Sequence, residues 1–186
     1  MSRRNKKMPD RTYDREKLKC LLHYVIKAAG ARPKFGAVKL YKVAWFADAS
    51  AYLRTGKSIT GATYIREKHG PIPKDAMSIR SELVRTGAIS QMNGGEYIGW
   101  KFKALANPDP NCFSQDELDT VNYWIKHIDE NHTATSISDE SHDYGWDIAS
   151  MGEELPFTAH MAERTREPNE KEKARLTERA KAIGLF

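Results

Sequence analysis

The segment AVKLYKVAWFADASAYLRTG (37–56) constrains the fold of this chain more than any other. At helical spacing, Leu40 and its neighbours lie on one side, while Tyr41 and Trp45 lie on another, so apolar residues cover most of the circumference. A helix that is apolar nearly all round is buried among other elements. The sequence therefore predicts a central helix over 37–56 that ends at Gly56.

The flanking segments predict helices and one β-hairpin. Asp14 is the expected N-cap of a helix that Gly30 ends in the left-handed conformation, and Ser114 with Glu117 predicts a capping box. An Asn-Gly turn at 93–94 predicts a hairpin. The expected order is helix, helix, strand (58–66), helix, hairpin, helix, helix. The fold class is α+β, a mainly helical domain with a small antiparallel β-sheet packed on helices.

The length of 186 residues suits one domain with tails. The net charge of +5 lies entirely in residues 1–19, which carry eight basic and three acidic groups. We expect a disordered basic arm over 1–12, a domain over 13–160 and a charged C-terminal helix over 161–186. The arm is either a solvated leader or a nucleic-acid contact, and we expect no nucleic-acid contact outside residues 1–19.

Cysteine usage and hydropathy indicate the compartment. No apolar run approaches the roughly 20 residues of a membrane span, and the basic N-terminus is not followed by the apolar segment of a secretory signal. Cys20 and Cys112 lie far apart without a CxxC motif, and we expect two free thiols. These features predict a cytoplasmic protein without a membrane contact.

The histidines do not form a metal-binding motif. Cys20 and His23 share a helix face but lack a second ligand pair, and His127 and His132 are five residues apart, on different faces of a helix. The sequence predicts neither a metal site nor another cofactor.

No local motif demands catalysis. Ser141, His142 and Asp143 are adjacent, and neighbouring residues on a helix point about 100° apart, so they do not form a relay. A metal-dependent hydrolase that uses His142, Asp143 and distant carboxylates is the enzymatic alternative, and the expectation is that the chain is not an enzyme.

The stretch KLYKVAWFADASAYLRTGKSITGATYIREKHGPIP (39–73) resembles the SocA-like antitoxin family, also called the Panacea antitoxin domain. It combines a Lys-Leu helix containing Phe-Ala-Asp, a Gly-x-x-Ile-Thr-Gly turn, a tyrosine strand and Gly-Pro-x-Pro. The residues that carry the resemblance are Lys39, Leu40, Tyr41, Trp45, Phe46, Ala47, Asp48, Gly56, Ile59, Thr60, Gly61, Tyr64, Gly70, Pro71 and Pro73.

The resemblance implies the antitoxin of a bacterial or phage toxin–antitoxin pair, which neutralises its cognate protein toxin by direct binding. A homodimer is also compatible with it, and a nucleic-acid-binding or phage-encoded regulatory protein that uses the basic arm is the alternative. The expected partner-binding residues are Tyr41, Trp45, Asp48, Tyr64, Lys68, His69 and Ile72. The expected structural residues are Gly56, Thr60, Gly61, Gly70, Pro71 and Pro73.

Two positions leave alternatives open. Pro71 and Pro73 stiffen the segment after Gly70 into a strand-to-helix corner, with Pro73 in the first turn of the next helix and Asp75 at its N-terminus. Ile72 either packs in the core or borders the partner surface together with Tyr64. Asp48 either caps the Thr60–Gly61 turn or receives an arginine of the partner.

Overall fold

The computed structural model of the chain describes residues 12–94, 99–109 and 111–158, together with Lys173, Thr177 and Lys181. Apart from Thr12 and these three residues, the expected basic arm and C-terminal helix lie outside the described residues. Within the described ranges, no helix is both long and apolar enough to cross a bilayer. The elements are α1 (Arg15–Ala29), α2 (Ala37–Thr55), β1 (Tyr64–Ile65), β2 (Ile72–Pro73), α3 (Ala76–Arg85), β3 (Ile89–Asn93), β4 (Trp100–Ala104), α4 (Gln115–Asn131), α5 (Ala134–Glu140), α6 (Tyr144–Ile148) and β5 (Glu154–Leu155).

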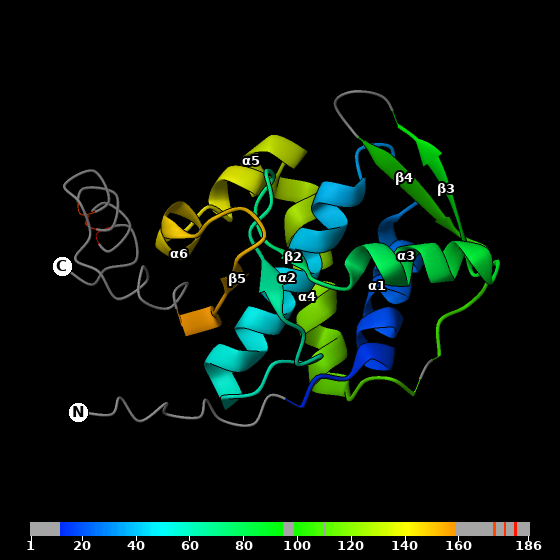
Figure 1. The fold of residues 1–186 in the computed structure, drawn as a ribbon, viewed down its shortest axis with the longest axis horizontal. Helices are drawn as coiled ribbons and strands as arrows, with labels where there is room; N and C mark the ends of the chain where they lie inside the picture. The colour runs from blue at the N-terminus through cyan, green and yellow to red at the C-terminus, as the bar shows by residue number, and fades with distance from the viewer. Residues whose placement is uncertain are drawn as a thin grey trace.

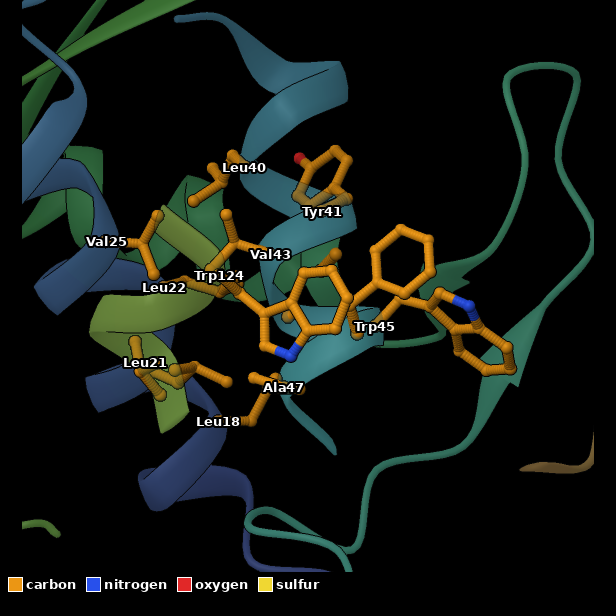
Figure 2. Packing of buried hydrophobic residues seen from close by; sticks show 14 of the residues in the cluster. Leu18, Leu21, Leu22, Val25, Leu40, Tyr41, Val43, Trp45, Ala47 and Trp124 are labelled. Carbon is orange, nitrogen blue, oxygen red and sulfur yellow. The ribbon is translucent and has the colours of Figure 1, made fainter. Parts of the chain in front are cut away.

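Helix α2 runs through the middle of the domain, as its apolar circumference predicts (Figure 1). Helices α1 and α4, the short helix α5 and strand β2 all contact it. Figure 2 shows Val43 and Ala47 on the side that faces α1, while Trp45 points the opposite way, where its ring centroid lies 5.0 Å from that of Tyr64. The helix ends at Gly56, as predicted, and Gly56 adopts the left-handed conformation with φ 74°.

Helix α1 begins as predicted and ends differently. The carboxylate of Asp14 accepts a hydrogen bond from the backbone N–H of Lys17. Gly30 has φ −61°, so the predicted left-handed C-cap is wrong. Glycine is required at position 30 for a steric reason, because a Cβ there would lie 2.8 Å from the carbonyl oxygen of Phe102 in β4. The missing side chain lets the hairpin approach the end of α1.

Two small antiparallel sheets complete the mainly helical α+β fold, which confirms the predicted class. The predicted β3–β4 hairpin is present, with Asn93 paired to Trp100 at the end of its ladder, and β1 pairs with both β2 and β5. Asn93 thus belongs to β3, and the predicted Asn-Gly turn stays a prediction because residues 95–98 lie outside the described residues. In the second sheet Tyr64 pairs with Pro73, so Pro73 lies in a strand and the prediction that it opens α3 is wrong. The predicted strand over 58–66 is reduced to Tyr64–Ile65.

Cys20 on α1 and Cys112, in the loop before α4, form a disulfide with a Cα–Cα distance of 6.5 Å. The prediction of two free thiols is therefore wrong. The disulfide forms because the chain after β4 returns across α1. A contact on this return path joins His23 Nε2 to the carbonyl oxygen of Ala106 at 3.1 Å. Burial lowers the pKa of His23. Cys20 and His23 are thus both engaged within the fold.

Candidate functional site

The segment between β1 and β2 is a tight hairpin loop rather than the predicted strand-to-helix corner. Gly70 has φ +88°, and its N–H donates to the carbonyl oxygen of Glu67 at 2.9 Å. The two strands pair Tyr64 with Pro73 and Ile65 with Ile72. The loop is therefore closed at its base by the sheet and turned at its tip by Gly70.

A buried lysine of α2 forms a hydrogen bond to the backbone of this loop. The ammonium of Lys42, a residue 1 % exposed, donates a 2.9 Å hydrogen bond to the carbonyl oxygen of Pro71. Burial lowers the pKa of Lys42 well below its usual range, because the charged form loses its hydration. The loop therefore rests on a side chain that belongs to the central helix.

Trp146 of α6 ties the start of the loop to the rest of the domain. Its indole N–H donates to the carbonyl oxygen of Glu67 at 3.1 Å, and the guanidinium of Arg66 lies 4.1 Å from its ring centroid. Arg66 also donates to the carbonyl oxygen of Ala149 at 2.8 Å. These contacts make Trp146 an anchor for the start of the loop.

An apolar cavity of about 300 Å³ opens between this loop, α2, α3 and β4. We call it the apolar groove. Met77 and Trp100 at its rim are 50 % and 41 % exposed, which is high for large apolar side chains. Its lining residues are Ala37, Val38, Tyr41, Lys42, Glu67, Lys68, His69, Ile72, Met77, Arg80 and Trp100.

A second hollow of about 440 Å³ lies next to the apolar groove and shares part of its wall. Ala134, Ser138 and Asp139 of α5 form its other side. The shared residues are Ala37, Val38, Lys68, His69 and Trp100. The exposed Lys68 and His69 at the loop tip therefore stand between two neighbouring depressions of one surface.

The groove carries a cation, Arg80, for which the described part of the chain supplies no carboxylate partner. Arg80 makes a long 3.4 Å hydrogen bond to the hydroxyl of Tyr41, and its guanidinium lies 5.6 Å from the ring centroid of Trp100. Its Nε is buried and has no hydrogen-bond partner among the described residues. Burial raises the pKa of Tyr41, so the phenol stays protonated beside Arg80. An incoming carboxylate would satisfy this guanidinium.

Four of the seven predicted partner-binding residues, Tyr41, Lys68, His69 and Ile72, come together in the lining of the groove. The other three lie in the core, since Trp45 is 1 % exposed and both Asp48 and Tyr64 are 0 % exposed. A docked protein does not reach these three side chains in this conformation.

Asp48 is held by the turn that follows α2. Its carboxylate accepts hydrogen bonds from the backbone N–H of Thr60 at 2.9 Å, the hydroxyl of Thr60 at 2.5 Å and the hydroxyl of Tyr64 at 2.8 Å. Burial raises the pKa of Asp48, and these hydrogen bonds oppose that rise. Of the two alternatives, the cap on the Thr60–Gly61 turn is the one observed. Gly61 has a positive φ of 68° in this turn.

The adjacent polar residues at 141–143 do not form a relay. The hydroxyl of Ser141 donates to the carbonyl oxygen of Ser138, and Asp143 is the N-cap of α6. The His142 ring stacks on Trp146 with a centroid distance of 3.6 Å. Each of these side chains therefore has a local structural contact that points away from the other two.

The described cations of the basic N-terminal segment are paired with carboxylates. Arg15 and Lys19 both bind Glu82 at 2.8 Å, and Lys17 binds Glu117 at 2.6 Å. The hydrogen bonds from Lys19 and Arg15 lower the pKa of Glu82 to about 2. These pairs join α1 to α3 and α4, and they occupy cations that a nucleic-acid contact would use.

Among the groove residues that sequence reasoning missed, three carry the chemistry of its rim, namely Met77, Arg80 and Trp100. They come from α3 and β4, outside the stretch that carries the family resemblance. The one available signal was Trp100 at the start of a hairpin strand, where an aromatic residue is favoured whether it is buried or exposed.

The fold and the groove define a small, mainly helical α+β domain with a preformed apolar depression on its surface. A family model described as antitoxin SocA-like, Panacea domain matches residues 40–147. The chain belongs to this family, which supports a role in a toxin–antitoxin pair in general. The comparison with curated proteins gave no match, and neither did the comparison with solved structures.

Proposed function

We propose that this chain is the antitoxin of a bacterial or phage toxin–antitoxin pair, and that it neutralises its cognate toxin in the cytoplasm by covering it, without catalysis. The observation that carries the proposal is the convergence of Tyr41, Lys68, His69 and Ile72 with Trp100 on one apolar groove. Family membership supports the general role, and the groove supplies a surface on which the toxin can dock.

The surface is suited to binding because it is held in place before a partner arrives. Each side chain immobilised on association costs about 0.5–1.5 kcal/mol. Here Pro71 and Pro73 restrict the backbone, Lys42 supports the loop and Trp146 anchors its start. Little ordering is then left for the binding step, so more of the contact energy appears as affinity.

The chemistry of the groove indicates what the toxin presents to it. The apolar walls can hold an aliphatic or aromatic side chain, and Arg80 can donate hydrogen bonds to a neighbouring carboxylate. Tryptophan and arginine are enriched among residues that dominate binding energy. A stable interface covers about 800 Å² on each partner, so the groove is its centre and the surrounding surface is its rim.

The test uses the proteins encoded beside this gene. Each neighbour is expressed alone and with this chain, and a neighbour that is lethal alone and tolerated with this chain is the cognate toxin. Binding of the purified pair is then measured for Trp100→Ala and Arg80→Glu. Leu105→Ala, on the same hairpin segment, and Arg85→Glu, on the same helix, are the matched controls, because both residues are exposed and lie outside the groove.

We expect Trp100→Ala and Arg80→Glu each to weaken binding by at least about thirtyfold, as substitutions at central anchor residues do, while the controls bind as the parent does. If no adjacent gene product is toxic and rescued, the antitoxin role is refuted. If rescue occurs but the groove variants bind like the parent, the groove is not the docking site. A parent chain that dimerises alone and dissociates on Trp100→Ala would instead make the groove a self-interface.

A further inference from the structure

Three potential metal ligands meet at the junction between α4 and α5. The ligand atoms of His127, His132 and Glu140 all lie within 4.8 Å of one another. The two imidazole centroids are 5.2 Å apart, and His132 Nε2 lies 3.5 Å from a carboxylate oxygen of Glu140. The cluster is independent of the apolar groove, because none of the three residues lines it.

The sequence does not indicate this cluster, because His127 and His132 would lie on different faces if one continuous helix contained both. Residues five apart on a helix do point to different faces, but α4 ends at Asn131. His132 is the C-cap, with an extended backbone (φ −130°, ψ 144°) that turns its side chain back toward the last turn of α4. Helix α5 then starts at Ala134 and brings Glu140 to the same place.

Neighbouring polar and aromatic groups orient both imidazole rings. The hydroxyl of Ser136 lies 3.3 Å from Nδ1 of His132, the nitrogen opposite the one that faces Glu140. Tyr123 stacks on the His127 ring with a centroid distance of 5.6 Å. Histidines that bind metals characteristically donate their second ring N–H to an acceptor, which fixes the tautomer and the ring orientation, and the Ser136 hydroxyl can accept from Nδ1 of His132.

We propose that His127, His132 and Glu140 form a binding site for a divalent transition metal of the zinc class. Two imidazoles and one carboxylate are ligands that zinc accepts, whereas calcium and magnesium prefer oxygen ligands alone. With bonds of about 2.0–2.2 Å, the ligand atoms of a tetrahedral zinc lie about 3.4 Å apart. The gap between His132 and Glu140 already has this size, and the other two gaps, which are at most 4.8 Å, require small rotations of the His127 and Glu140 side chains. Water completes the fourth position.

A metal bound here would fasten α5 to the end of α4. Helix α5 has only seven residues, and hydrophobic anchoring of its inner face depends on Ile137. Ser138 and Asp139 of the same helix line the second hollow. A metal that joins α4 to α5 would therefore help to fix the position of α5, which forms one wall of the second hollow.

The test is calorimetric titration of the untagged, disulfide-intact chain with ZnCl₂, followed by titration with CoCl₂ read by visible absorption. We expect one metal per chain, a higher Tm with zinc, and a cobalt spectrum of four-coordinate type. Removal of an outer-shell partner typically costs 10–100-fold in affinity, so removal of a direct ligand in His132→Ala should cost at least about 100-fold.

Glu140→Gln keeps the proposal falsifiable if His132→Ala disturbs the helix end, because Glu140 is exposed and its replacement is nearly isosteric. His69→Ala is the matched control, an exposed histidine outside the cluster, and it should bind zinc as the parent does. The absence of stoichiometric binding by the parent would overturn the proposal. So would binding that persists unchanged in both His132→Ala and Glu140→Gln.

Discussion

Replacement of Gly70 by alanine tests how the loop beside the groove is held. Gly70 has φ +88°, where an alanine costs about 1–2 kcal/mol. An added Cβ would also lie 2.2 Å from the hydroxyl oxygen of Ser141 and 2.5 Å from the ammonium nitrogen of Lys42. Both atoms are side-chain ends, but they are buried and bonded, Lys42 to Pro71 and Ser141 to Ser138.

The cost of the clash follows from those two hydrogen bonds. Displacing Lys42 leaves a buried polar pair without its bond, at about 1–3 kcal/mol, and displacing Ser141 adds about 0.5–1.5 kcal/mol. Gly70→Ala should therefore destabilise the fold by about 3–6 kcal/mol in total. Gly87→Ala is the matched control, because its φ is +73° and an added Cβ meets nothing within 4 Å. It should cost only the backbone penalty of about 1–2 kcal/mol.

Urea denaturation followed by tryptophan fluorescence measures both variants against the parent. A Gly→Ala change lowers the conformational entropy of the unfolded chain by the same amount in both variants. The difference between their free energies of unfolding therefore measures the clash alone. We expect a difference of about 2–4 kcal/mol in the free energy of unfolding, with unchanged denaturant slopes. Equal losses in the two variants would refute the reasoning and show that Lys42 and Ser141 do not hold the loop rigidly.

Three further predictions concern buried groups. Reduction of the Cys20–Cys112 disulfide, or Cys112→Ser, should lower the free energy of unfolding by about 2–4 kcal/mol, since the bridge closes a long loop; urea melts with and without dithiothreitol measure this, and an unchanged midpoint contradicts it. Burial raises the pKa of Asp48, so its contribution is full at a pH below its unfolded value of about 3.9 and is lost as the pH rises through the folded pKa; Asp48→Asn should flatten that part of the stability–pH curve, and a curve that keeps the slope of the parent counts against it. Burial lowers the pKa of Lys42, so its contribution is full above about pH 10.4 and is lost as the pH falls through the folded pKa; Lys42→Met should abolish that dependence, and an unaltered profile would show that Lys42 is not its source.

The local elements were predictable because their signals lie within a few residues of one another. The carboxylate of Asp14 and the Ser114–Glu117 capping box each satisfy backbone groups next to them. The apolar circumference of α2 likewise reports its burial directly. Such features require no knowledge of the rest of the fold.

The errors arose where a distant segment decides the outcome. Pro73 suits a first helical turn, but pairing with Tyr64 keeps it in a strand. Gly30 suits a left-handed cap, but the approach of Phe102 is what excludes a side chain there. The disulfide depends on a chain path that no spacing of Cys20 and Cys112 encodes.

The candidate site was predictable only in part, for the same reason. The family resemblance located Tyr41, on the central helix α2, and Ile72, in β2 at the end of the loop. Met77, Arg80 and Trp100 reach the groove through tertiary packing of α3 and β4. The exposure of Trp100 and the lack of a hydrogen-bond partner for Nε of Arg80 among the described residues are properties of the folded surface, and a sequence does not display them.

The disulfide also turns residues 20–112 into a covalent ring. The three walls of the groove other than α2, which are the segment 67–72, α3 and β4, all belong to this ring. A protease that cuts the backbone once anywhere inside it leaves the two pieces joined, so they can remain packed around α2. The nicked molecule would run as a single band on a denaturing gel until the bridge is reduced, and only a second cut or a reductant would release a piece of the surface.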